Sequence, residues 1–167
     1  YPIIVKAVDH VDTTSPSLEV NTHATHTIIR DQEWEYRINH TGTDILESIA
    51  VNGKVLATGG RLVARMHSGD PQGGSIKQLP VSLLFGNISE VITEQDGPIQ
   101  AVLCIKGAYT EEGSALREVM PFTLRLYFYQ GVQSVKMVHS FVYEGDQHCD
   151  FIGGIGLEFD IPFRHEL

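Results

Sequence analysis

The sequence predicts an all-β protein, folded as an antiparallel β-sandwich. Apolar and polar residues alternate over many short runs, which is the period of a half-buried β-strand. No long segment repeats its apolar residues every 3.6 positions, so no long amphipathic helix is expected. Short turns rich in Gly, Asn and Asp separate the runs, and short connections favour antiparallel neighbours over parallel ones.

The N-terminal half consists of short alternating runs. Trp34, Tyr36 and Ile38 fall on one face of their run. Glu35 and Arg37 fall on the other face, which is typical of a strand with one solvated side. The predicted strands of this half are residues 1–8, 17–22, 23–30, 34–38, 45–51, 55–56 and 62–66.

Two glycine-containing sites are expected to turn or bend this half. Asn52-Gly53 lies between two apolar runs, and both residues tolerate the positive φ that a type I′ hairpin turn requires. Gly59-Gly60 is predicted to bend or bulge the chain. Residues 67–80 are rich in Gly, Pro and Ser and form the longest irregular segment, a kind of loop that is often functional or mobile.

The C-terminal half brings the total to about twelve predicted strands. Residues 107–120 are expected to form a polar hairpin loop rather than a helix. The segment 121–163 is predicted to be a β-meander, in which each strand pairs with the one before it. The predicted strands of this half are residues 81–85, 88–94, 99–106, 121–130, 134–143 and 155–161.

One strand of the meander suggests that the chain is part of a larger multidomain protein. Met137 and Phe141 lie on one side of residues 134–143, and Val138 and Val142 lie on the other. A strand that is apolar on both sides is covered on both sides, by a large sheet or by a neighbouring domain. We expect residues 1–167 to form one β-sandwich region. The alternative is that 1–66 end a preceding β domain and 81–163 form the sandwich core.

Composition and charge exclude some partners. The chain has 167 residues, 42% of them hydrophobic, and a formal net charge of −9. Nucleic acids and anionic membrane surfaces need a basic patch, so neither is expected as a partner. No run approaches the roughly 20 apolar residues of a membrane span. The sequence begins without Met or a signal peptide, so we interpret it as an excerpt, a processed product or a domain of a longer protein.

Two further features bear on secretion. Asn39 and Asn87 each begin an N-x-S/T sequon and are expected at a strand end or in a loop, where they would carry glycan on a secreted glycoprotein. Cys104 and Cys149 permit one disulfide but do not require it. We expect a secreted protein, with the pairing of the two cysteines left open.

The strongest cluster of potential metal ligands is the segment YEGDQHCDF, residues 143–151. A tight turn cannot direct all of these side chains at one point, and turns use Asp and Gly for backbone reasons. We therefore expect no metal site and no cofactor. His23 and His26 are expected to face opposite sides of one strand, so that they do not share a ligand.

Candidate binding residues lie on the strands of the meander. Arg125, Tyr127 and Tyr129 share one face of their strand, and Arg with Tyr suits a carboxylated sugar, although a polar outer face is the simpler interpretation. His139 lies among apolar residues, where a hydrogen-bonded core histidine is more usual than a base. The chain has no G-x-S-x-G, P-loop, H-E-x-x-H or C-x-x-C motif.

Three segments carry a family resemblance: GPIQAVLCIKGAY (97–109), PFTLRLYFYQGVQSVKMVHSFVYEGD (121–146) and DFIGGIGLEFDIP (150–162). Together they resemble the exo-rhamnogalacturonan lyase-like proteins of fungi and bacteria, with Glu144 where the family usually has Asp. The resemblance implies a supersandwich-like central β-sandwich, between an N-terminal β-barrel-like domain and a C-terminal (α/α) toroid.

The resemblance also implies a function. The full-length protein would be a secreted lyase that cleaves a pectin-type, acidic, rhamnose-containing polysaccharide by β-elimination, and this fragment alone would be inactive. The catalytic base and acid are not assigned to any residue. Arg125, Tyr127 and Tyr129 would bind substrate, with Arg61, Arg65 or His139 as lesser candidates. The expected partners are acidic polysaccharide and the remaining domains of the parent; the alternative is a non-catalytic carbohydrate-binding or structural and assembly module.

Overall fold

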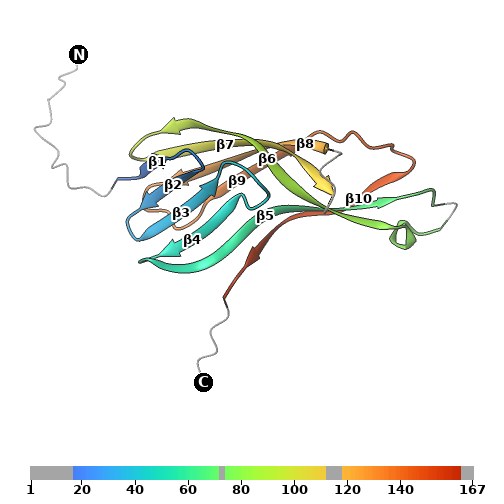
Figure 1. The fold of residues 1–167 in the computed structure, drawn as a ribbon, viewed down its shortest axis with the longest axis horizontal. Helices are drawn as coiled ribbons and strands as arrows, with labels where there is room; N and C mark the ends of the chain where they lie inside the picture. Colours follow the sequence, from blue (N-terminus) through green and yellow to red (C-terminus); the bar gives the residue numbers. More distant parts are fainter. Residues whose placement is uncertain (1–16, 72–73, 112–117, 163–167) are drawn as a thin grey trace, which may run out of the picture.

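The chain folds into ten strands and one short 3₁₀ turn in the computed structural model, which describes residues 17–71, 74–111 and 118–162 (Figure 1). The predicted all-β class is confirmed, and none of these residues forms an α-helix. No helix among them has the length and hydrophobicity of a membrane span. The elements are β1 (Glu19–Thr22), β2 (His26–Asp31), β3 (Trp34–Asn39), β4 (Leu46–Val51), β5 (Lys54–Ser68), η1 (Ile76–Gln78), β6 (Val81–Asp96), β7 (Gln100–Glu111), β8 (Glu118–Tyr129), β9 (Lys136–Phe141) and β10 (Asp150–Asp160).

The long strand β5 divides the sheet into two layers. Strands β1 to β9 pair antiparallel in chain order, and β10 pairs with β5. A strand has only two edges, and β10 occupies one edge of β5 along residues 58–68. The other edge is shared, because β4 pairs with residues 54–60 and β6 with residues 63–67. From this edge β1–β4 continue as one layer and β6–β9 as the other (Figure 1).

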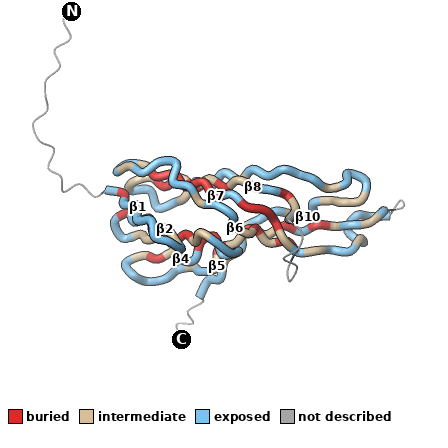
Figure 2. Tube along the Cα trace, turned by 45° about the horizontal axis from the view of Figure 1, so that its top comes forward, coloured by how far each residue is buried: buried red, intermediate tan, exposed pale blue. Residues whose placement is uncertain are grey.

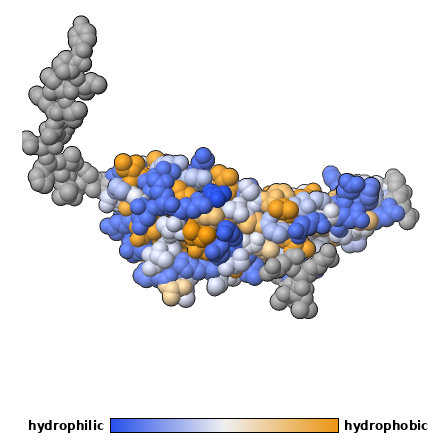
Figure 3. Space-filling model, turned by 90° about the horizontal axis from the view of Figure 1, so that it is seen from above, coloured by the Kyte–Doolittle hydropathy of each residue, from blue (hydrophilic) through white to orange (hydrophobic). Residues whose placement is uncertain are grey.

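The two layers enclose one hydrophobic core. The rings of Tyr36 on β3 and Phe128 on β8 lie 5.2 Å apart between their centroids, so the layers pack face to face. The buried carboxylate of Asp31 accepts a hydrogen bond from the Gly131 amide at 2.7 Å, which joins the β2–β3 turn to the segment after β8. Buried residues are concentrated in β7 and β8 (Figure 2). On the face drawn in Figure 3, polar and apolar side chains are interspersed.

Several predicted strands merge into longer ones. The predicted runs 55–56 and 62–66 both belong to β5, and the runs 81–85 and 88–94 both belong to β6. In β5 a register shift interrupts the alternation without ending the pairing, and in β6 Gly86 and Asn87 continue the regular pairing with β7. Gly59, with φ of +61°, lies at a register shift and confirms the predicted bulge. The structure has ten strands where about twelve were expected, and the predicted strand 1–8 lies outside the described residues.

The predicted meander is correct for two strands and wrong for the third. Strands β8 and β9 pair antiparallel, as expected. Strand β10 instead pairs with the distant strand β5, in a register that runs from Asp150 opposite Ser68 to Asp160 opposite Thr58. A short connection makes neighbouring strands probable partners but does not exclude an open edge elsewhere. The third strand also begins at Asp150 and not at residue 155.

The described residues of this chain do not cover both faces of the strand predicted at 134–143, and cover by a neighbouring domain stays a prediction. Among the described strands, β9 lies at an edge and pairs with β8 alone. Val138 and Phe141, on its opposite faces, are both exposed, and Val142 just beyond it is exposed as well. Apolar residues that would be buried on a central strand stay exposed on an edge strand, because no neighbouring strand covers them.

The turns follow the predicted chemistry where they are described. Asn52 and Gly53 have φ of +49° and +73° between the paired residues Val51 and Lys54, as a type I′ hairpin requires. The predicted loop 67–80 is shorter than expected, since β5 extends to Ser68 and η1 lies within the segment. The loop 107–120 is also shorter, and its residues 112–117 lie outside the described residues. The division into 1–66 and 81–163 stays a prediction.

Gly107 provides a test of the packing between neighbouring strands. A Cβ at this position would overlap the carbonyl oxygen of Asn87 and approach Phe122 Cζ to 2.7 Å. Overpacking against backbone is costly, so Gly107→Ala should lower the free energy of unfolding by about 1–3 kcal/mol. A Cβ at Gly154 would meet nothing within 4 Å, which makes Gly154→Ala the matched control. Urea unfolding measures both; equal midpoints for the two variants would contradict the packing described.

Candidate functional site

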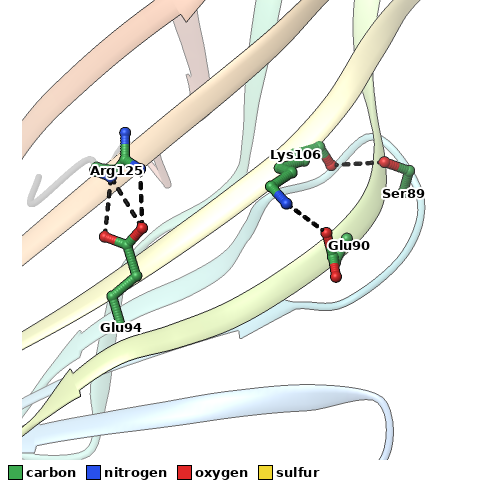
Figure 4. Close-up of polar contacts among 5 residues, drawn as sticks. All are labelled: Ser89, Glu90, Glu94, Lys106 and Arg125. Atoms are coloured by element: carbon green, nitrogen blue, oxygen red, sulfur yellow. Dashed lines mark hydrogen bonds and ion pairs between the residues drawn. The ribbon is translucent and has the colours of Figure 1, made fainter.

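The predicted binding face on β8 contains an arginine that already has a carboxylate partner. The Arg125 Nε donates to Glu94 Oε2 at 2.9 Å, and its Nη2 donates to Glu94 Oε1 at 2.9 Å (Figure 4). These hydrogen bonds lower the pKa of the Glu94 carboxyl. Nε and Nη2 of Arg125 are both bound to Glu94, so a sugar carboxylate would have to compete with Glu94 for these two guanidinium nitrogens.

The two tyrosines share the outward face of β8 with Arg125, as the sequence predicts. Both are half-buried, and Tyr127 lies opposite Lys136 on β9. The Lys136 ammonium sits 5.2 Å from the centroid of the Tyr127 ring. Tyr129 pairs with Gln100 at the end of β7. The structure therefore brings the three predicted residues onto one face, but one ring and one guanidinium have internal partners.

His139 does not join this face. It pairs with Leu124 on β8, whose side chain is fully buried, whereas Arg125 pairs with Val138 on the opposite side of the same two strands. The His139 Nε2 lies 3.4 Å from the Tyr109 hydroxyl, and its ring stacks on Phe141 at 5.6 Å. Burial lowers the pKa of His139 and raises the pKa of Tyr109 to about 12. The arrangement is that of a neutral histidine at the margin of the core.

The prediction that His23 and His26 lie on opposite faces of one strand is wrong. His23 follows β1 and His26 begins β2, so a hairpin turn separates them. Their rings stack with centroids 4.7 Å apart. His40 follows β3 directly, and its Nε2 lies 2.8 Å from Oγ1 of Thr27 on β2. Across residues 17–71, 74–111 and 118–162, no three His, Cys, Asp or Glu side chains are placed to hold a metal ion.

The acidic segment after β9 forms a self-contained turn. The amide of Asp146 donates to Asp150 Oδ2 at 3.0 Å, and the amide of His148 donates to Asp146 Oδ1 at 2.8 Å. Turn stabilisation thus accounts for the clustering of these side chains. Cys149, in the same turn, and Cys104, buried on β7, are both free thiols.

The two sequon asparagines lie in different settings. Asn39 is the last residue of β3, as expected, and its amide nitrogen donates to the Asp44 carbonyl at 2.8 Å. Asn87 lies inside β6, opposite Ala108, and the expectation of a strand end or loop is wrong there. Gly86 and Asn87 are residue types common in loops, but here they continue the regular pairing of β6 with Tyr109 and Ala108 of β7. Whether either asparagine carries glycan stays a prediction.

A cavity of about 260 Å³ is lined by the last residues of β5, by β6, β7 and β8, by the segment after β9 and by the first residue of β10. It has three carboxylates and an apolar floor, with no Lys, Arg or His in its lining. Its Glu111 accepts a hydrogen bond from Ser82 Oγ at 2.8 Å, and Asp150 accepts one from Ser68 Oγ at 2.9 Å. A uronate would be repelled by like charge here. Its lining residues are Met66, Ser68, Ser82, Leu84, Glu111, Val119, Met120, Tyr143, Glu144, Gly145 and Asp150.

The outward side of β5 presents a second cationic surface, which we call the β5 face. Alternate residues of β5 point outward: Arg61, Val63, Arg65 and His67, whereas the residues between them are buried. Arg61 lies 5.7 Å from the Phe85 ring centroid, with its Nη2 at 3.7 Å from Glu158 Oε1. The face is thus built by three strands, since Phe85 belongs to β6 and Glu158 to β10.

Arg65 is the member of the β5 face that remains available. It is exposed, and its neighbours across the strands are Leu83 on β6 and Gly154 on β10. Neither neighbour is charged, and no carboxylate within the described ranges forms an ion pair with Arg65. Gly154 and Gly156 leave the surface beside it low and open. A free guanidinium beside a flat surface can take a carboxylate bidentately. From the sequence, Arg65 ranks below Arg125 as a candidate. The carboxylate that occupies Arg125 belongs to Glu94, 31 positions earlier in the chain, and the sequence alone does not reveal this pair.

Comparison with known proteins identifies relatives of the chain. A family described as "PcRGLX-like protein central beta sandwich domain" matches residues 18–167. The "Uncharacterized protein YetA" of Bacillus subtilis (strain 168) is 34% identical over 130 residues, which are 77% of this chain and 15% of that protein. The chain therefore spans about 15% of the length of this curated relative.

The buried setting of His139 predicts a pH effect on stability. Its pKa is below the ordinary value of about 6.5 in the folded chain, so the unfolded chain binds more protons as the pH falls through that value. Stability is therefore lost on acidification. His139→Leu should lose less stability than wild type between about pH 7.5 and about pH 5.5. Urea unfolding at both pH values measures this; equal losses in the two proteins would contradict it.

Proposed function

The chain belongs to the PcRGLX-like proteins as their central β-sandwich domain, and on this premise we propose that its parent is a secreted polysaccharide lyase. The parent would cleave an acidic, rhamnose-containing polysaccharide of the rhamnogalacturonan type by β-elimination. Within it, this domain would hold the polysaccharide without breaking the bond.

The described chemistry supports a non-catalytic role for the domain. β-Elimination needs a base that removes the C5 proton of the uronate and a cation that stabilises the charge developing on the carboxylate. The cavity beside the start of β10 offers carboxylates but no cation among its lining residues. Arg125 is engaged by Glu94, and His139 faces the margin of the core. These positions favour a catalytic centre contributed by other parts of the parent.

The observation that carries the binding role is the free guanidinium of Arg65. In a chain of net charge −9, the arginines at positions 30, 37, 61 and 125 have carboxylate partners, whereas Arg65 has none in the described part of the chain. A polyuronate lying along β5 would meet Arg65 and then Arg61, about 13 Å apart at 3.3 Å per residue. The negative net charge would keep the affinity modest and sensitive to salt.

The activity of the parent can be tested directly. The full-length parent, incubated with rhamnogalacturonan, should produce a rise in the ultraviolet absorbance of unsaturated uronate. The 167-residue chain alone should produce none. No rise with the parent on any of several acidic polysaccharides would reject the lyase assignment, and a rise with the isolated chain would reject its non-catalytic role.

The binding role has a separate test with the isolated chain. Arg65→Ala should weaken binding of rhamnogalacturonan or polygalacturonate about tenfold, since a charge-assisted hydrogen bond contributes about 1.5–3 kcal/mol. Arg125→Ala makes the same change in net charge at a paired arginine and should weaken binding less than about twofold. Isothermal titration calorimetry at low salt, with a neutral galactan as negative control, measures both. Equal losses in the two variants would reject the β5 face, and loss only in Arg125→Ala would restore the β8 face.

A further inference from the structure

Strand β10 lies across β5 from both layers and has an unpaired edge: its residues 151–156 lie opposite the part of β5 that β6 uses, and Asp160 lies opposite the part that β4 uses. One of its edges pairs with β5 from Asp150 to Asp160. The other edge pairs with no strand in the described ranges. An open edge presents a row of backbone donors and acceptors that another chain segment can pair with.

The composition of β10 does not protect this edge. Its central run, FIGGIGL at residues 151–157, carries no charged side chain, and the acidic residues of the strand lie at its ends. Ile152 and Ile155 are 38% and 36% exposed, although they pair with the buried Met66 and Ala64 of β5. They have the orientation of core residues and are exposed because the sheet ends at this strand.

The outer edge of the β1–β4 layer shows the usual protection. Strand β1 has four residues, EVNT, and is mostly exposed and polar. Native proteins commonly blunt free edges in this way, with short strands and polar or charged side chains. An uncharged, apolar run at an edge is an aggregation hazard unless something covers it. The contrast between β1 and β10 indicates that β10 is covered in the assembled protein.

We propose that the unpaired edge of β10 is the docking surface for the domain that follows this one in the parent protein. The domain is described as central in its family, and the chain spans only 15% of its curated relative, so other domains flank it in the parent. The chain leaves β10 at Asp160, the last residue of the strand with the open edge, whereas β1 lies at one end of the strand order, with β2, β3 and β4 between it and β5 (Figure 1). A domain tethered at Asp160 is present at high effective concentration beside this edge.

Ile161 extends the docking surface past the end of the strand. It is 60% exposed, the largest exposure among the isoleucines at this edge. With Ile152 and Ile155 it gives three uncovered isoleucines within ten positions, a patch of the kind that marks interaction sites. This inference needs only the central position of the domain and holds whether or not the parent is a lyase.

Hydrogen exchange measured by mass spectrometry tests the proposal in two proteins, the full-length parent and the 167-residue chain. Peptides from β10 should be protected in the parent and exchange at least tenfold faster in the isolated chain, while β1 peptides should exchange alike in both. Equal exchange of β10 in the two proteins overturns the proposal. Protection of β10 in an isolated chain that is dimeric by light scattering also overturns it, in favour of a second copy.

Matched variants separate docking from folding. Ile155→Glu in the parent should remove the extra protection of β10, while Val55→Glu should not, since Val55 is 44% exposed at the β4–β5 hairpin, outside residues 58–68 that pair with β10. Both variants should leave the thermal midpoint of the isolated chain close to wild type. If Ile155→Glu lowers that midpoint, Ile161→Glu, beyond the strand, is used in its place. Retained protection with the charge at position 155 or 161 overturns the proposal.

Discussion

The shared edge of β5 is the constraint on which the architecture depends. A strand of five or six residues can serve one neighbour on each edge, but a 15-residue strand can serve two neighbours in succession on one edge. Strand β4 uses the first part and β6 the last, so the sheet separates into two layers without a break in hydrogen bonding. The layers then face each other and bury a single core. The β5 face lies on this strand, and β10 pairs along it.

The placement of charge follows from packing an acidic chain into two layers. Most arginines at strand positions find a carboxylate across the strand or one strand further, and such pairs hold their geometry without adding much stability. Arg125 and Glu94 belong to β8 and β6, with β7 between them and the buried Cys104 beneath. Arg65 differs because its cross-strand neighbours are an apolar residue and a glycine. Availability to a ligand is therefore decided by the neighbours and not by the type of residue.

Local pattern was enough for those elements whose stability is local. The type I′ turn at Asn52-Gly53 and the alternation of Tyr36 and Ile38 were predicted correctly, because each depends on a few adjacent residues. The family resemblance, carried by segments between residues 97 and 162, agrees with the family match over 18–167. Strand ends were predicted less well, since a register shift in β5 and residue types common in loops within β6 interrupt the strand pattern while the pairing continues.

The sequence by itself determined the all-β class, the main turns, the family and the identity of the residues that line each strand face. Only the tertiary structure decided that β10 pairs with β5, that Arg125 is bound by Glu94 and that Arg65 is not bound. The physical reason is that each of these depends on partners far apart in the chain, 31 positions for Arg125 and Glu94 and 82 for Ser68 and Asp150. Periodicity reports which side of a strand a residue occupies, and it carries no information on which distant strand will lie beside it.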